Sequence, residues 1–202
     1  MTIKIAISDT VTKEQRRDPR FINLLKGEER FFNSPAFATK YRKLLALHEA
    51  GHSVWAKKAD ATNIHFYGPE MFWDERPEYD CPLVSRSSTG YTLPAAVTSL
   101  HAIKAGIAGF VVREYYGSPN DAIAIGMDIN GARQRYAELV GGTEADFQKE
   151  VVKAKAEIIA ELASPAVQAE ILAEINRFEQ EIFPAPKLTS SVLRARRMAW
   201  AY

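Results

Sequence analysis

The clearest pattern of apolar and polar positions lies between residues 34 and 58. Ser34 and Pro35 are residue types that favour the cap and the first turn of a helix. Beyond them, apolar side chains and two histidines recur at steps of three and four residues, at Phe37, Tyr41, Leu44, Leu45, His48, His52 and Trp55. This spacing predicts a helix to about Lys58 that turns both histidines inward.

Two short runs of β-branched and aromatic residues are typical of strands. They cover 62–67, with the sequence TNIHFY, and 90–93, with the sequence GYTL. We expect them to pair as a small sheet beside the helix. Residues 68–89 between them show no regular period, and we expect an irregular connection there. Near the N-terminus, residues 3–7 alternate weakly like one more short strand.

The second half of the chain is predicted to be helical. One helix opens at Pro94 and ends near Gly117, because glycine favours the position that follows a helix. Three more helices follow: part of 121–140, a helix that begins at Thr143, and one that runs from Pro165 to a stop before Pro184. Thr143 and Asp146 approximate a capping box at the start of the second of these.

These elements indicate an α+β fold, predominantly helical, in a single domain over residues 1–202. We divide this domain into an N-terminal extension (1–33), a core (34–142), and C-terminal helices with a tail (143–202). The hydrophobic content of 47% is enough for one sizeable core. The tail carries three arginines beyond Pro186, and we expect it to be a frayed, solvated end.

Charge and cysteine content narrow the range of partners. Lys and Arg number 26 and Asp and Glu 25, so the net charge of +1 gives no field that would attract nucleic acid or an anionic membrane. There is no apolar run of spanning length and no secretory signal pattern. We therefore expect a cytoplasmic protein without a nucleic-acid or membrane partner. Cys81 is the only cysteine, so a metal would have to be held by histidine and carboxylate.

Residues 47–52, LHEAGH, carry the candidate chemistry. His48 and His52 are four residues apart, so on a helix they lie on one face and can bind one metal ion together. A catalytic zinc site has three protein ligands and a water molecule, so a third ligand is needed. Glu49 is rotated about 100° from His48 around the helix and can act as the general base for that water.

The bare His-Glu-x-x-His pattern can arise by chance, but its setting strengthens the interpretation. The pattern lies on the apolar stripe of a long predicted helix, where two unpaired histidines would be unfavourable. Peptide hydrolysis by zinc-activated water is the reaction that these residues favour, with one Zn²⁺ per chain.

The chain resembles the FtsH-type zinc peptidases, whose motif is likewise a helical His-Glu-Ala-Gly-His. The likeness continues downstream in the same order, at 90–94 (GYTLP), at 105–117 (AGIAGFVVREYYG), and at 126–129 (GMDI) with Ala132. It covers roughly residues 40 to 140. It implies that His48 and His52 are zinc ligands, that Glu49 is the base, and that Asp128 is the third ligand.

Two other carboxylates compete for the place of the third ligand. The family usually has Asn before this Asp, where Met127 stands here, and Asn120-Asp121 offers a competing match. Glu114 is a further candidate, because glutamate completes the site in many other zinc peptidases. We place Asp128 first, then Glu114, then Asp121.

Residues 68–89 are longer than the family's usual connection and suggest a role at the cleft. Phe72, Trp73 and Tyr79 could pack on a substrate or form a lid, while the backbone of Gly90, Tyr91 and Thr92 could pair with an extended peptide substrate. Cys81 could cap the zinc, although an ordinary thiol is the simpler interpretation. His65 and His101 receive no ligand role.

FtsH proteins join the peptidase to membrane-spanning helices and an ATPase, but this sequence contains neither an apolar span nor a Gly-x-x-x-x-Gly-Lys-Ser/Thr loop. We therefore expect an ATP-independent zinc metalloendopeptidase that cleaves flexible proteins or peptides, or that depends on a separate unfoldase or regulatory partner. The family's rings suggest a homo-oligomer. One alternative is a regulatory peptidase specific for one partner protein. Another is a non-catalytic, metal-dependent interaction module on the same scaffold.

Overall fold

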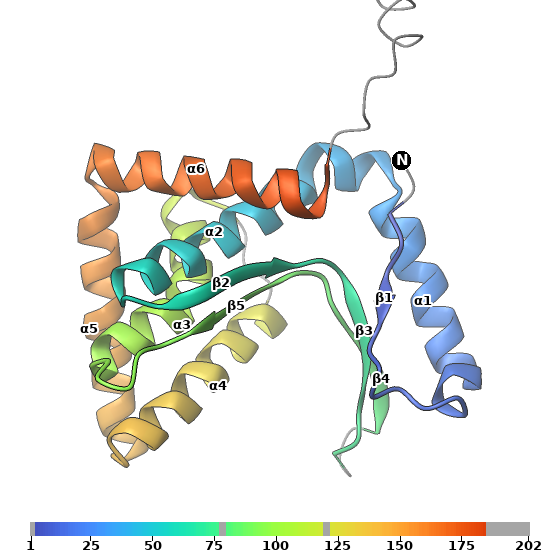
Figure 1. Cartoon of the computed structure of the whole chain (residues 1–202), viewed down its shortest axis with the longest axis horizontal. Coiled ribbons are helices and arrows are strands. Elements are labelled where there is room, and N and C mark those ends of the chain that lie inside the picture. Colours follow the sequence, from blue (N-terminus) through green and yellow to red (C-terminus); the bar gives the residue numbers. More distant parts are fainter. Residues whose placement is uncertain (1–2, 77–79, 119–121, 185–202) are drawn as a thin grey trace, which may run out of the picture.

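The structure is a computed structural model that describes residues 3–76, 80–118 and 122–184. It confirms a predominantly helical α+β arrangement with a small amount of sheet (Figure 1). The helices are α1 (Pro19–Phe32), α2 (Arg42–Lys58), α3 (Ser99–Tyr115), α4 (Ala122–Leu139), α5 (Glu144–Leu162) and α6 (Pro165–Ile182). The strands are β1 (Ala6–Ile7), β2 (Thr62–Tyr67), β3 (Glu70–Asp74), β4 (Cys81–Ser85) and β5 (Ser88–Thr92).

Helix α2 is the central element of the fold. The predicted start is present: the Ser34 hydroxyl accepts a hydrogen bond from the amide of Phe37 (3.1 Å), and a π-helical turn over Phe37–Tyr41 leads into α2. In Figure 1, α2 lies between α6 and the β2–β5 pair. It also packs closely on α3, because a Cβ added to Gly51 would lie only 2.7 Å from the carbonyl oxygen of Ala108. This close approach brings the histidine face of α2 against α3.

The predicted pair of strands is present, but the connection between them is more ordered than expected. β2 and β5 pair antiparallel, with His65 opposite Gly90. The expectation of an irregular connection is wrong, because β3 and β4 pair antiparallel within it, from Glu70 opposite Ser85 to Asp74 opposite Cys81. The apolar run of β3 is short and flanked by charged residues, so its strand character does not show as a period.

The N-terminal residues are also more ordered than the sequence indicated. Strand β1 adds to β3 in parallel, and a helix that we did not predict, α1, follows. Asp18 caps α1 by accepting a hydrogen bond from the amide of Arg20 (2.7 Å), and Pro19 takes the first helical position. Phe21 and Phe32 of α1 are buried with side chains of β3 and α6. Residues 3–33 are therefore packed into the same body as α2.

The C-terminal helices follow the prediction apart from one boundary. α3 begins at Ser99 and not at Pro94, because the Thr98 hydroxyl caps the amide of His101 (3.2 Å) while Pro94 opens a turn closed by the amide of Val97. Thr143 caps α5 and Pro165 takes the first turn of α6, as predicted. The main apolar core lies among α2, α3, α4, α5 and α6. It fixes α4 and α2 relative to α3.

Candidate metal centre

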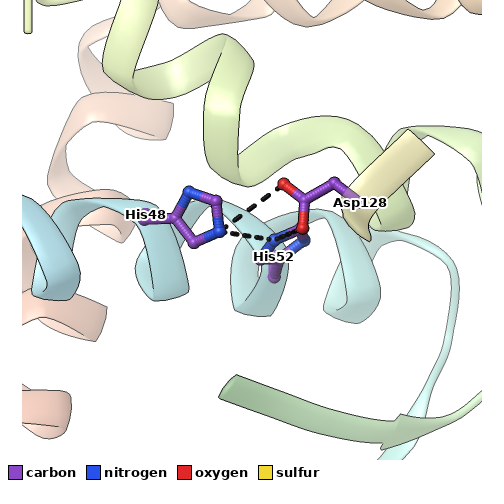
Figure 2. Close-up of side chains that lie close together, drawn as sticks. All are labelled: His48, His52 and Asp128. Carbon is purple, nitrogen blue, oxygen red and sulfur yellow. Dashed lines mark hydrogen bonds and ion pairs between the residues drawn. The ribbon is translucent and has the colours of Figure 1, made fainter. Parts of the chain in front are cut away.

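Helices α2 and α4 bring His48, His52 and Asp128 together (Figure 2). The Nε2 atom of His48 lies 3.5 Å from Oδ2 of Asp128, and the Nε2 atom of His52 lies 3.4 Å from Oδ1. The two Nε2 atoms are 3.2 Å apart. Figure 2 shows the carboxylate of Asp128 pointing between the two imidazoles from the neighbouring helix. These three side chains are close enough to hold one metal ion.

The hydrogen bond at Nδ1 of His52 leaves Nε2 of that imidazole available for a metal. His52 Nδ1 lies 2.8 Å from the carbonyl oxygen of Ala105 on α3. Because a carbonyl only accepts hydrogen bonds, Nδ1 must donate, so a neutral His52 has its lone pair on Nε2. Among the described residues, the buried Oδ2 of Asp128 has no hydrogen-bond partner. A buried carboxylate oxygen without a donor is unfavourable unless a cation satisfies it, so the set fits a divalent metal.

The two imidazoles have shifted pKa values. Burial, together with the nearby His52, holds the pKa of His48 below its usual value. Burial also acts to lower the pKa of His52, but the Asp128 carboxylate outweighs it and raises this pKa to about 9. Without a metal, the carboxylate is thus balanced by a proton on His52. A divalent cation would supply that positive charge instead and leave both imidazoles neutral.

Glu49 occupies a separate place beside this group. Its side chain is only 2% exposed, and each carboxylate oxygen accepts one hydrogen bond from a hydroxyl. Ser87 Oγ donates to Oε1 at 2.7 Å, and Thr89 Oγ1 donates to Oε2 at 2.7 Å. Glu49 is thus held by Ser87 and Thr89, and it is not one of the three side chains grouped closely enough to hold a metal.

A pocket of about 490 Å³ opens onto these residues. One side is formed by residues 85 and 87–91 with Leu93, and the other by α4, including Asp128 and Arg135. Of the three residues predicted to bind substrate, Gly90 and Tyr91 line this pocket, whereas Thr92 is exposed and is not among the lining residues in the described part of the chain. Burial, with the charge of Asp128, raises the pKa of Tyr91 to about 12, so Tyr91 offers a neutral hydroxyl.

Of the two competing ligand candidates, Glu114 does not join the group. The Glu114 side chain is 47% exposed and pairs with Lys155 of α5 at 2.7 Å. Asp121 lies outside the described residues. Cys81 lies at the start of β4, opposite Asp74, and takes no part in the group; neither do His65 and His101.

Of the side chains suggested for a substrate contact or a lid, Phe72 and Trp73 are not among the described residues that line the pocket. Trp73 stacks on Phe21 of α1 (6.4 Å between ring centroids), and its indole donates a hydrogen bond to Asp80 (2.8 Å). It therefore belongs to the packing between β3 and α1. Tyr79 lies outside the described residues. Among the described residues of this segment, Ser85 and Ser87 to Thr89 line the pocket.

Several residues around the centre were not identified from the sequence. Among them are Ser87, Thr89 and the carbonyl of Ala105, which contact the site from other elements of the fold. The periodicity of a sequence does not predict such contacts. Gly109 of α3 is another, since a Cβ there would lie 2.4 Å from His52 Nε2. The small-residue character of this helix was visible in the sequence, but nothing in it distinguished Gly109 from the glycines nearby.

No family model matches the chain, and a search of curated proteins finds no match. In the part of the chain that the structure describes, no helix combines the length and hydropathy needed to cross a membrane. The class of the protein must therefore be inferred from its fold and from the geometry of the His48, His52 and Asp128 group.

Proposed function

We propose that this protein is an ATP-independent zinc metalloendopeptidase of the FtsH type, with one Zn²⁺ per chain. The observation that supports this most strongly is the convergence of His48, His52 and Asp128 next to buried Glu49, at the floor of an open pocket. The resemblance of residues 40–140 to FtsH peptidases supports the same class. Two imidazole nitrogens and one carboxylate oxygen are a ligand set typical of catalytic zinc, which keeps a further position for water.

In this proposal three residues of the chain bind the metal and one transfers the proton. Zn²⁺, when bound, acts as a Lewis acid that makes water a nucleophile near neutral pH and polarises a carbonyl group. His48, His52 and Asp128 would hold the ion. Glu49 would accept a proton from the attacking water and return it to the leaving amine. The hydroxyls on Glu49 take up one acceptor site on each carboxylate oxygen, so sites remain for that proton.

The pocket suits a peptide in extended conformation. Within the described residues β5 pairs only with β2, and its residues Ser88 to Tyr91 line the pocket. An extended peptide can add to such a strand through backbone hydrogen bonds, with its side chains lodged between β5 and α4. A pocket of about 490 Å³ holds only a few side chains, so we propose that the substrate is a flexible segment and not a folded domain.

The test compares Glu49→Gln with Glu114→Gln in the full chain. We expect both variants to keep about one zinc per chain by metal analysis, because neither residue belongs to the ligand group. The rate of casein cleavage should fall by about 1,000-fold or more in Glu49→Gln, whereas Glu114→Gln should cleave casein at the wild-type rate. A zinc-loaded wild type that leaves casein and a broad peptide library intact would overturn the proposal in favour of an interaction module.

The same library digest addresses the breadth of specificity. Cleavage of many unrelated peptides would support a general endopeptidase, whereas cleavage of a single sequence would support the regulatory peptidase. Dependence on a separate unfoldase, assembly into a homo-oligomer and a cytoplasmic location all stay predictions. They can be tested by comparing folded and unfolded substrates, by sedimentation and by fractionation.

A further inference from the structure

The carboxylate of Glu49 is held symmetrically by two hydroxyls from one short segment. Ser87 reaches one oxygen and Thr89 the other, both at 2.7 Å, and Thr89 Oγ1 also lies 3.2 Å from the carbonyl oxygen of Glu49 itself. Hydrogen bonds to both oxygens of a carboxylate oppose rotation about its last side-chain bond. A buried glutamate next to an open pocket is therefore fixed in one orientation.

The segment that carries these hydroxyls is itself anchored on both sides. Arg86, between them and β4, donates from Nε and Nη2 to the two carboxylate oxygens of Glu28 on α1, at 3.1 Å and 2.9 Å. Ser85 Oγ donates to the carbonyl oxygen of Ser87 at 3.1 Å. Thr89 is held by its pairing with Phe66 of β2. The hydroxyls are thus placed by contacts with α1 and with the β2–β5 sheet.

We propose that Ser87 and Thr89 are positioning residues that aim the Glu49 carboxylate for proton transfer. This inference rests on the proposed function. Without the two hydroxyls, the carboxylate could turn within the site toward the imidazoles, where it would compete with Asp128 for a cation. The hydroxyls of Ser87 and Thr89 keep Glu49 available as a base and prevent it from becoming a metal ligand. They do not themselves touch the substrate.

The first test is kinetic and uses isosteric variants. Thr89→Val and Ser87→Ala should each lower kcat on casein by about tenfold, because each removes one hydrogen bond to a charged group. KM should stay within about twofold, since the hydroxyls do not bind substrate. Thr89→Ser and Ser87→Thr retain the donor and should restore most of kcat. Thr62→Val, the same change at an exposed position on the neighbouring β2, serves as the control and should leave kcat unchanged.

The second test does not depend on activity. A double-mutant cycle of Glu49→Gln with Thr89→Val measures their coupling by urea unfolding of the full chain in EDTA, so that metal binding does not contribute. We expect Thr89→Val to lower the folding equilibrium constant by about tenfold more when Glu49 is present than when Gln replaces it. Equal effects in the two backgrounds would overturn the inference.

The two tests distinguish a failure of the positioning role of Ser87 and Thr89 from a failure of the proposed function. If the wild type cleaves casein and the variants Thr89→Val and Ser87→Ala both retain full kcat, the positioning role of the two hydroxyls is wrong, and the proposed peptidase function is unaffected. If the wild type cleaves nothing, the peptidase proposal fails, and the double-mutant cycle still decides whether the hydroxyls fix Glu49. Loss of zinc from the hydroxyl variants would overturn the inference, because it would place these residues in metal binding.

Discussion

Gly109 of α3 lies directly against the imidazole of His52. A Cβ added to Gly109 would be 2.4 Å from Nε2 of His52 and 2.8 Å from Nε2 of His48. These are the two nitrogens that would bind the ion. The other ring nitrogen of His52, Nδ1, is held by the carbonyl of Ala105. The imidazoles can therefore lie side by side only where α3 has no side chain.

The first prediction concerns this contact. Gly109→Ala should push the imidazoles apart and weaken zinc binding by about 100-fold, because ligand orientation is lost while the ligands remain. Zinc titration of the purified variant measures the change. Gly27→Ala is a matched control, since Gly27 lies within α1 with no atom within 4 Å of its added Cβ. It should bind zinc normally and gain about 0.5–1 kcal/mol of stability. Unchanged zinc affinity in Gly109→Ala would contradict the geometry.

The second prediction identifies the third ligand. Asp128→Ala should lower the zinc content of the protein well below one per chain, because two imidazoles alone leave the site incomplete. Glu114→Ala should keep its zinc, since Glu114 is paired with Lys155 and half exposed. Asp121→Ala, at the remaining sequence alternative, should keep its zinc as well. Metal analysis of the three proteins compares them directly, and a zinc-free Glu114→Ala or Asp121→Ala would reverse the assignment.

The sequence was informative where one helix carries the pattern. His48 and His52 share a face of α2 because they are one turn apart, and that relationship survives any tertiary arrangement. Asp128 was reached through resemblance alone, since its approach to the histidines depends on how α4 packs across α3. The Thr143 and Pro165 helix starts were likewise local signals, and the structure contains both.

What the sequence did not reveal depends on contacts between distant segments. α1 was missed because residues 26–30 (KGEER) separate its apolar side chains into two groups, and its burial comes from packing against β3 and α6. The pairing of β3 with β4 is similarly set by partners. Ser87 and Thr89 lie in the connection 68–89, where the sequence shows no regular period. Only the close approach of β5 to α2 gives them Glu49 as a neighbour.

A buried ionic cluster next to the site provides the last prediction. Ser53, the residue after His52, is fully buried, and its hydroxyl donates to Oε2 of Glu174 on α6 at 2.6 Å. Lys57 donates to the other oxygen, and Arg177 Nη2 lies 2.8 Å from Oε2. Glu174 thus ties the motif helix to α6 through two donors of α2, Ser53 and Lys57.

Burial acts to raise the pKa of Glu174, but the hydrogen bonds from Lys57 and Ser53 outweigh it and hold this pKa below its usual value. A carboxyl with a lowered pKa in the folded state stabilises the fold above its unfolded pKa of about 4.3, and that contribution is lost as pH falls through the folded value. Glu174→Gln should therefore lower the free energy of unfolding by about 2 kcal/mol at pH 7 and lose less stability than the wild type on acidification.

Urea unfolding between neutral and acidic pH measures both effects. Glu170→Gln, at an exposed position on the same helix, is the control and should follow the wild type. Equal stability of Glu174→Gln and the wild type at pH 7, with parallel acid dependence, would show that the cluster contributes nothing to holding α2 against α6.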